Sequence, residues 1–458
     1  MTRTPTFDYD YIVIGSGAGG SPAASILASA GKKVAIVDKS TLGGESPNWD
    51  DIPTGAFIHA ATSYRTAKAA STYGLRTSTV GYNYPSLLSW KDTVIKRTGA
   101  SNNRYYYEKQ GISVFIGNAH FLSPNEITVN RRHLSARKFL IATGSEWRIP
   151  AIAGLEDIPY HTPKTIFTFT RPPKTLFIVG MGVTAIELAH AFSTFGTKVY
   201  LASPARRVVS EFDTEVSELL AQDGKQHRGI TFLPQTTVIA VQKQGLQKRI
   251  TFVQGRTERS VRVDEIVIAD QRVPATDIGL ENAGVTYDQD GISVNASLQT
   301  SARHIFAAGS VIDVHCQTHD ILAQSRICAQ NLLHRATYHF DNMPRLYVAF
   351  THPEVAQVGF NEYECEKHNI SIKTATVPLK LTARSNITDQ QTGLVKLIAN
   401  TKKDVLVGAS IIAPQASDMI SELALAIRYG LTAQQIMTTP HCFTSWSEAI
   451  RIAAGKLL

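Results

Sequence analysis

Cysteine is scarce in this sequence, and no two of its four cysteines have C-x-x-C spacing. The spacing argues against a zinc motif and against a vicinal redox dithiol. Isolated cysteines are usually small buried hydrophobic residues, and a reducing cytoplasm is the natural compartment for such a chain. No apolar run approaches the roughly 18 residues that a membrane span needs. Residues 1–10 carry no basic and apolar leader, so we expect no export.

Acidic residues are outnumbered, with 38 Asp and Glu against 46 Lys and Arg and a net charge of +8. The basic residues are scattered along the chain, which argues against nucleic-acid binding and fits a solvated surface that favours anions. Phosphate-bearing cofactors would also favour such a surface. At 43% hydrophobic and 18% charged, the 458 residues fit a soluble globular protein. This length predicts about two to four domains.

The most informative segment runs from Tyr11 to Asp38. An apolar strand (11–14) is followed by a glycine-rich turn (15–20), an Ala-rich helix and a second strand that ends at Asp38. In such a unit the first glycine allows a tight turn, Gly17 lets a pyrophosphate approach the backbone, and Gly20 lets the helix pack on the strand. The helix N-terminus offers N–H groups to phosphates, and an acid at Asp38 suits a ribose. We therefore predict dinucleotide binding; an ordinary strand–helix turn is the alternative.

A second unit of the same kind begins at Thr175, with a strand (175–179), a Gly180-Met-Gly182 turn, a helix from about residue 184 to 195 and a strand (198–202). The presence of two such units is explained if FAD binds one and a nicotinamide dinucleotide binds the other. The alternative is that one of the two units has no binding role. The second unit ends in Ser203 without an acid, and Arg206 and Arg207 follow. This favours a 2′-phosphate and hence NADPH, unless both arginines are plain surface charges.

The residues after Asp38 resemble the pyridine nucleotide-disulfide oxidoreductases, the family of glutathione, dihydrolipoamide and mercuric reductases. Near its flavin the family reads Gly-Gly-Thr-Cys, four residues, then Cys-Ile-Pro-Ser-Lys. This chain has the same frame over residues 43–55, but Ser46 and Asp51 occupy the cysteine positions and Gly55 the lysine position. The resemblance therefore implies a member of the family that lacks the redox-active cysteine pair.

The resemblance extends along the whole chain. Ala142-Thr-Gly closes the first part of the family's FAD domain, and residues 270–276 resemble its Gly-Arg-x-Pro-Asn-Thr motif, with Arg272 matching. Gly309 is followed by Ser310 where the family has an aspartate that bonds the flavin ribityl chain, which implies weaker FAD binding. Residues 348–359 match the family's Phe-Thr-x-Pro-Glu-Val-Ala-x-Val-Gly segment closely.

The resemblance implies an α/β fold with two Rossmann-like nucleotide-binding domains plus a C-terminal α+β dimerisation domain, and hence a homodimer. We expect the first part of the FAD-binding domain at 1–150, the NAD(P)-binding domain at 151–275, the second part of the FAD-binding domain at 276–343 and the dimerisation domain at 344–458. Residues 61–110 read as helical with polar breaks near 77–83, residues 226–300 as short strands, and residues 320–334 and 416–429 as helices.

The family's catalytic acid/base is the second His of His-x-His-Pro-Thr-x-Ser-Glu, supplied by the dimer partner. Here Phe443 occupies that position, His441 matches only the first His, whose role is packing, and Glu448 matches the glutamate. Glu187 matches the acid that pairs with the flavin-side lysine. With that lysine absent, Glu187 faces the flavin or another cation, or is a plain helix residue.

The two residues at the cysteine positions leave alternatives open. A carboxylate at Asp51 beside the flavin would tend to lower the flavin potential, and burial would raise the pKa of Asp51. Ser46 or Asp51 would bond a substrate oxygen, or both would simply fill space. Neither supplies the thiolate that thiol–disulfide exchange requires.

We therefore predict an FAD-dependent oxidoreductase that passes electrons from NAD(P)H through FAD to a small non-disulfide acceptor such as a quinone. The alternative is a catalytically degraded FAD-binding dimer that acts as a binding or structural module. We expect no metal, no nucleic acid and no membrane span, and a cytoplasmic location. The catalytic candidates are Ser46, Asp51, Glu187, His441 and Glu448. The cofactor-binding candidates are Gly15, Ser16, Gly17, Ala18, Gly19, Gly20, Asp38, Lys39, Gly43, Gly44, Glu45, Ser46, Ala119, Ala142, Thr143, Gly144, Gly180, Gly182, Val183, Thr184, Ala185, Glu187, Ser203, Arg206, Arg207, Gly309, Ser310 and Ala323.

Overall fold

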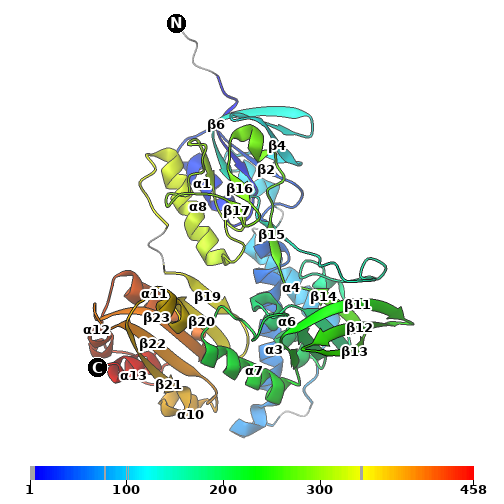
Figure 1. Cartoon of the computed structure of the whole chain (residues 1–458), viewed down its shortest axis with the longest axis vertical. Coiled ribbons are helices and arrows are strands. Elements are labelled where there is room, and N and C mark those ends of the chain that lie inside the picture. The colour runs from blue at the N-terminus through cyan, green and yellow to red at the C-terminus, as the bar shows by residue number, and fades with distance from the viewer. Residues whose placement is uncertain (1–5, 77–78, 100, 102, 341–343) are drawn as a thin grey trace. The chain divides into compact units, whose positions relative to one another are not determined.

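The structure is a computed structural model that describes residues 6–76, 79–99, 101, 103–340 and 344–458. Three expectations fall partly outside the described residues: the leader-free N-terminus, the polar break near 77–83 and the domain boundary after residue 343. The chain forms two compact units, whose elements are labelled in Figure 1. Unit 1 comprises Met1–Pro53, Ser89–Arg148 and Gln271–Asn342, and unit 2 comprises Thr54–Leu88, Ile149–Asp270 and Met343–Leu458.

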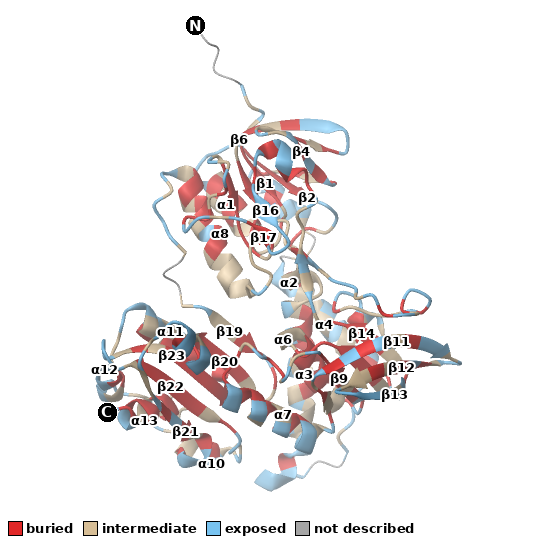
Figure 2. Cartoon of the chain, in the orientation of Figure 1, coloured by how far each residue is buried: buried red, intermediate tan, exposed pale blue. Residues whose placement is uncertain are grey.

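Unit 1 is built on a seven-stranded sheet with the order β3-β2-β1-β6-β5-β4 and with β18 beside β6. The pairs β2–β3, β1–β2, β1–β6 and β6–β18 are parallel, whereas β4–β5 and β5–β6 are antiparallel. The parallel strands β1, β2 and β18 are mostly buried apolar runs, as expected for strands with both faces covered, and Figure 2 shows β1 and β2 as buried. The strands are β1 (Tyr9–Ile14), β2 (Val34–Asp38), β3 (Ser113–Ile116), β4 (Ala119–Ser123), β5 (Glu126–Val129), β6 (Arg132–Ile141) and β18 (Ile305–Ala307).

Helices α1 and α8 pack against each other in unit 1. The backbone N–H of Ala23 in α1 donates to Oγ of Ser325 in α8 at 3.1 Å, and Leu27 and Cys328 share one buried cluster. The small residues of α1 permit this close approach. The further elements are α1 (Ser21–Ser29), α2 (Glu45–Asn48), α5 (Arg104–Glu108), α8 (Thr318–Leu333), β7 (Ser145–Trp147), β15 (Arg272–Pro274), η3 (Leu280–Ala283), β16 (Tyr287–Asp288) and β17 (Gly291–Ile292), and residues of both units contribute to α3 (Asp51–Lys68) and α4 (Tyr84–Thr98).

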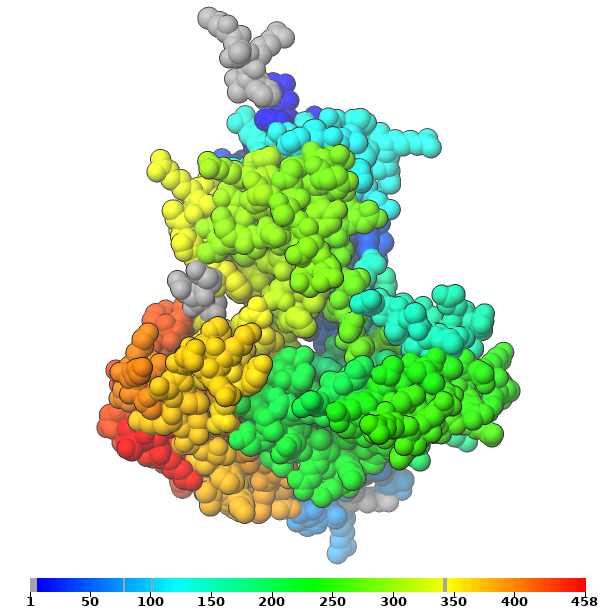
Figure 3. All heavy atoms as spheres, in the orientation of Figure 1, coloured from blue at the N-terminus to red at the C-terminus, as the bar shows by residue number. Residues whose placement is uncertain are grey.

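Unit 2 contains a second parallel sheet with the order β10-β9-β8-β14, and a separate antiparallel sheet, β11-β12-β13. The outer strand β13 exposes four consecutive residues, and the three-stranded sheet forms the green surface at the lower right of Figure 3. The elements are β8 (Thr175–Val179), α6 (Val183–Thr194), β9 (Lys198–Ala202), α7 (Thr214–Arg228), β10 (Thr231–Leu233), β11 (Thr236–Gln244), β12 (Gln247–Gln254), β13 (Thr257–Val263), β14 (Glu265–Ile268), η1 (Ala70–Tyr73) and η2 (Ile166–Thr168).

The C-terminal part of unit 2 is an antiparallel sheet with the order β19-β20-β23-β22-β21. Helices α11 and α13 bury Leu423 and Ile450 in the same core as Leu397 of the sheet. The elements are β19 (Leu346–Ala349), β20 (Glu354–Gly359), α9 (Glu362–Lys367), β21 (Ile372–Pro378), η4 (Leu379–Leu381), α10 (Ala383–Ile387), β22 (Leu394–Asn400), β23 (Val405–Ala413), α11 (Ala416–Arg428), α12 (Ala433–Thr438) and α13 (Glu448–Lys456).

The predicted fold class, two Rossmann-like sheets and a C-terminal α+β region, is confirmed. Two element predictions were wrong. Helix α3 begins at Asp51 rather than near residue 61, with an acid and Pro53 in its first turn, both of which suit a helix start. Residues 226–228 belong to helix α7 rather than to a strand, and the helix ends at Gly229, which has φ = +63°.

Candidate functional site

The turn after β1 explains why glycine occupies its first and last positions. Gly15 has φ = +101°, and a Cβ there would lie 2.1 Å from the carbonyl oxygen of Ala142. A Cβ on Gly20 would lie 1.9 Å from the carbonyl oxygen of Gly15 and 2.9 Å from Cγ1 of Val13. Since no side chain fits at either position, the turn requires glycine at both ends.

The middle of this turn is open. A Cβ on Gly17 would meet only Cα of Gly44, at an ordinary contact distance of 3.5 Å. Gly44 has φ = +71° and would place a Cβ 2.5 Å from Cα of Gly17, so this side of the opening must stay free of side chains. Helix α1 begins here, and its first turn holds Ser21, whose N–H donates to the Gly17 carbonyl oxygen at 2.9 Å, and Pro22, which has no N–H. The helix therefore offers the positive end of its dipole to an anion at this turn. The backbone therefore fits the pyrophosphate of a dinucleotide.

Asp38, the last residue of β2, connects the glycine turn to the Gly43-Gly44 segment. Its Oδ2 accepts hydrogen bonds from the Ser16 N–H at 3.0 Å and from the Ser16 hydroxyl at 2.5 Å. Oγ of Ser16 also accepts from the Gly43 N–H at 2.9 Å. This network holds the carboxylate at the strand end, the position for which the sequence predicts a ribose contact.

The other FAD candidates lie mostly at the same sheet edge. Ala142-Thr143-Gly144 follows β6 and Gly309-Ser310 follows the neighbouring parallel strand β18, so both segments meet where β1 and β2 also end. The N–H of Gly309 donates to Oε1 of Gln324 at 2.7 Å. Two of the FAD candidates have other surroundings. Ala119 is buried in β4 and pairs with Val129, and Lys39 forms an exposed ion pair with Glu146.

Arg272 in β15 organises the segment that follows Gly44. Its guanidinium group pairs with Glu45 of α2 and donates from Nε to Oγ of Ser145 at 2.8 Å. It also lies 4.7 Å from the centre of the Trp147 ring. A planar guanidinium group can make all these contacts at once, and a lysine cannot. The sequence matched Arg272 to a family motif without indicating this role.

Two adjacent carboxyl groups, Asp50 and Asp51, stand beside this ion pair. Burial, and then the charges of Asp51 and Glu45, raise the pKa of Asp50 from 3.8 to about 7, against the lowering effect of Arg272. Asp50 is therefore partly protonated at neutral pH. The expected burial of Asp51 was wrong: its side chain is exposed at the start of α3, and its Oδ2 accepts from Oγ1 of Thr318 at 2.6 Å. Ser46 is half-buried in α2.

The second glycine turn, in unit 2, has the same design as the first. Gly180 has φ = +135°, and a Cβ there would lie 2.1 Å from the carbonyl oxygen of Ala269. Gly182 precedes α6, and a Cβ there would meet nothing within 4 Å. The candidates Val183, Thr184 and Ala185 form the first turn of α6. This opening also suits a phosphate group at a helix N-terminus.

The two arginines after β9 differ in their surroundings. Arg207 donates to Oγ1 of Thr214 and to the carbonyl oxygens of Ser210 and Phe212, so its guanidinium group is already engaged. The side chain of Arg206 is exposed. Ser203 donates to Asp270 at 3.3 Å, and burial raises the pKa of that carboxyl. Arg207 is therefore engaged by its own loop, whereas Arg206 is exposed to solvent.

The remaining catalytic candidates lie in unit 2. The buried Glu187 of α6 accepts at Oε1 from the backbone N–H of Phe350 at 2.7 Å. Nδ1 of His441 lies 2.8 Å from the Thr439 carbonyl oxygen, and its Nε2 lies 2.7 Å from Oε1 of Glu422. These contacts are local and fit the packing role implied for His441.

In the C-terminal segment, Phe443 occupies the position of the family's catalytic histidine, and Glu448 matches the family's glutamate. The side chain of Phe443 is 74% exposed. The buried Oε2 of Glu448 has no hydrogen-bond partner among the described residues.

Two findings concern all the residues that the structure describes. No group of His, Cys, Asp and Glu among them is arranged to hold a metal ion. No described helix is both long and apolar enough to cross a membrane.

Comparison with known protein families now identifies the group to which the chain is related. The family model of the pyridine nucleotide-disulphide oxidoreductases matches residues 9–330, and that of their dimerisation domain matches residues 346–454. The chain belongs to the pyridine nucleotide-disulphide oxidoreductases. Members of this family are flavin oxidoreductases that use FAD and NAD(P)H.

Individual relatives match over nearly the whole chain. A dihydrolipoyl dehydrogenase of Thermus scotoductus is 31% identical over 455 residues, which covers 98% of this chain and 97% of that protein. A mercuric reductase of Streptomyces lividans is 31% identical over 457 residues, covering 97% and 95%. The Cu(II) complex of the HOCl-induced flavoprotein disulfide reductase RclA from Escherichia coli has a TM-score of 0.87 at 24% identity, covering 99% of this chain and 100% of that chain. At this identity the structural match shows the fold alone.

Proposed function

We propose that this protein passes electrons from NAD(P)H through FAD to a small acceptor that is not a disulfide, such as a quinone. The observation that carries the proposal is the pair Ser46 and Asp51 at the positions where the family's redox cysteines are expected. A thiolate is required for thiol–disulfide exchange, and neither side chain can form one. None of the four cysteines forms a disulfide, and burial raises the pKa of the Cys328 and Cys365 thiols, which disfavours the thiolate at both positions.

The residues of unit 1 suit FAD binding. The open backbone at Gly17 and Gly44 would hold the pyrophosphate, Asp38 the ribose, and Ser310 the ribityl chain. When bound, FAD supplies the two-electron chemistry, and the protein supplies position and electrostatics. Arg206 would hold a 2′-phosphate at the second turn, so we retain a slight preference for NADPH.

The carboxyl groups after Gly44 support an acceptor that needs protons. Reduction of a quinone to a hydroquinone takes up two electrons and two protons. Asp50, with a pKa of about 7, is partly protonated at neutral pH, whereas an ordinary aspartic acid has lost its proton. A site that has lost the family's cysteine pair and carries a protonated Asp50 beside it fits oxygen-centred acceptors better than sulfur-centred ones. We propose Asp50 as the proton donor and Asp51, bonded to Thr318, as its electrostatic neighbour.

We further propose that the protein is a homodimer that associates through residues 346–454, because these match the family's dimerisation domain. The four domain ranges expected from the sequence and the cytoplasmic location stay predictions.

The test begins with the cofactor. Purified protein should be yellow, with about one flavin per chain, and anaerobic NADPH or NADH should bleach it. Bleached protein should then be reoxidised by a benzoquinone and not by glutathione disulfide, lipoamide or mercuric ion. Turnover of any of the last three acceptors at a rate comparable to the quinone would contradict the proposal. Protein that cannot take up FAD would contradict every flavin-based function.

The alternative is a catalytically degraded FAD-binding dimer that serves as a binding or structural module. The observation that favours it lies at the C-terminus, where Phe443 replaces the family's acid/base and Glu448 keeps an unpaired buried oxygen. Flavin that is retained but that neither NADPH nor NADH reduces would support this alternative.

A further inference from the structure

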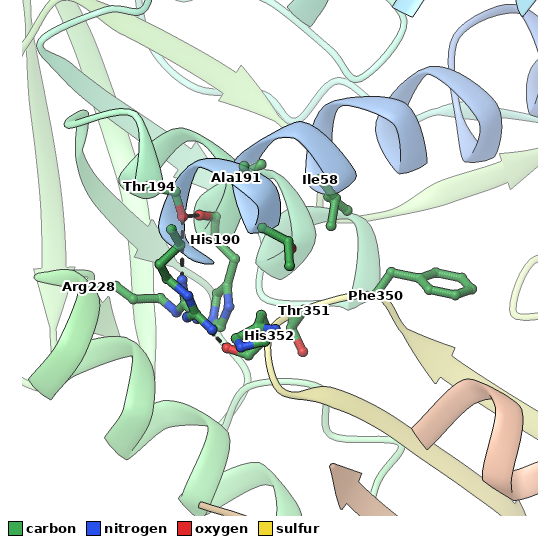
Figure 4. Close-up of a pocket in the computed structure, with 11 residues that line it drawn as sticks. Ile58, His190, Ala191, Thr194, Arg228, Phe350, Thr351 and His352 are labelled. Atoms are coloured by element: carbon green, nitrogen blue, oxygen red, sulfur yellow. Dashed lines mark hydrogen bonds between the residues drawn. The ribbon is translucent and has the colours of Figure 1, made fainter. Parts of the chain in front are cut away.

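A small cavity in unit 2 is lined by none of the residues of the glycine turn at Gly180 and Gly182. It is lined by α3, α6, α7 and the segment after β19 (Figure 4). The volume that the centre of a water molecule could occupy inside it is about 10 Å³. This is room for about one particle of that size. The lining side chains that carry the following argument are Thr62, Arg65, His190, Thr194 and Arg228.

The cavity carries an excess of positive charge. Arg228 is buried, with a side chain that is 4% exposed, and it pairs with Asp223 at 3.2 Å. Arg228 also donates to Oγ1 of Thr194 and to the carbonyl oxygen of His352. Asp223 thus neutralises one guanidinium group. The second, that of Arg65, has no ion-pair partner among the described residues.

The electrostatic consequence appears at Arg65 itself. Burial and the repulsion of Arg228 lower the pKa of Arg65 to about 10, against the opposing effect of Asp223. Guanidinium groups are otherwise charged at every physiological pH, so a shift of this kind marks an uncompensated cation. An anion placed between the two arginines would remove the repulsion.

His190 points to the same conclusion independently. The residue is 4% exposed, and both ring nitrogens lack a hydrogen-bond partner among the described residues. Figure 4 shows the ring extending from α6 toward Arg228 and the His352 segment. A buried imidazole N–H without an acceptor costs about 1–3 kcal/mol. The cavity therefore contains an unused donor beside an unpaired cation.

We propose that this cavity is a binding site for a single small inorganic anion of the halide class, held by Arg65, Arg228 and the His190 ring. The size of the cavity selects a monatomic ion, because phosphate and sulfate carry four oxygens and exceed the available room. The ion accepts from the two guanidinium groups and from one His190 N–H, and it completes the charge balance with Asp223. Bound there, it ties α3, α6 and α7 together.

The experiment uses the full-length protein with its flavin bound. Thermal unfolding is followed in 100 mM sodium chloride and in 100 mM sodium gluconate at equal pH and ionic strength. For a site of millimolar affinity we expect chloride to raise the midpoint by roughly 3 °C. The matched variants are Arg65→Gln, which removes the unpaired cation, and Lys68→Gln, which removes one from the exposed side of the same helix. The chloride effect should be lost in R65Q and kept in K68Q.

A second measurement keeps the proposal testable if R65Q folds poorly. Crystals of the wild-type protein are soaked in sodium bromide, and an anomalous peak is expected between Arg65, Arg228 and His190. Density for an ordered water without anomalous signal would overturn the proposal. Equal midpoints in chloride and gluconate would overturn it as well, even with a bromide peak at crystal concentration. So would a chloride effect that R65Q retains.

Discussion

Replacing Asp50 with asparagine should stabilise the protein above neutral pH. The folded protein holds the Asp50 proton up to a pKa of about 7, whereas an unfolded chain releases it near 3.8. The folded state therefore binds more protons than the unfolded state between these values, and the wild-type protein loses stability as the pH rises through them. D50N has no proton to lose. Its advantage should be absent near pH 4, grow through pH 5 and 6, and be complete above pH 7.

The size of this advantage follows from the pKa shift. A shift from 3.8 to about 7 corresponds to about 4 kcal/mol. Because the Asp50 side chain is partly exposed, solvent screening reduces this figure to about 2 kcal/mol. At about 1 °C per kcal/mol for a chain of 458 residues, the unfolding midpoint at pH 8 should rise by about 2 °C.

The assay is thermal unfolding of the flavin-bound protein from pH 4 to pH 9, with D50N compared with wild type at each pH. Asp290→Asn is the matched control, since it makes the same change at an exposed turn of unit 1. Its midpoint should follow the wild type throughout. Equal midpoints for D50N and wild type at pH 8, or an advantage that shrinks with rising pH, would refute the reasoning.

Four further substitutions test other parts of the account. Gly17→Ala meets only an ordinary contact at Gly44, so it should fold but lose FAD affinity at least tenfold, measured by flavin release. Gly182→Ala should instead keep the flavin and raise KM for NAD(P)H. Arg206→Gln should raise KM for NADPH several-fold and leave that for NADH unchanged; an equal rise for both would reject the 2′-phosphate contact. Gly55→Ala, in an exposed and open position of α3, should stabilise by about 1 kcal/mol in denaturant unfolding, and destabilisation would contradict its helical geometry.

The parts of the structure that could be predicted from sequence depend on short-range chemistry. A Cβ on Gly20 would collide with Gly15 and Val13 of the same turn, so the need for glycine at this position is local, whereas the clash at Gly15 comes from Ala142 at the end of the distant strand β6. Asp38 could likewise be assigned to a strand end from its position in the chain.

What could not be predicted depends on residues far apart in sequence. Arg272 reaches Glu45 across 227 positions, and Thr318 reaches Asp51 across 267. Neither the exposure of Asp51 nor the raised pKa of Asp50 follows from the local sequence, because both depend on which distant groups the fold brings near. The cationic cavity around His190 has no sequence signal at all, since α3, α6 and α7 each contribute part of it.

The most direct test of the central claim counts electrons. Flavin takes up two electrons and a redox disulfide takes up two more, so the number of reducing equivalents reports whether a sulfur relay is present. The flavin-bound protein is titrated anaerobically with dithionite while its absorbance is followed. We predict complete bleaching at one two-electron equivalent per flavin, with no further uptake. Uptake of a second equivalent would reveal a redox disulfide and contradict the account.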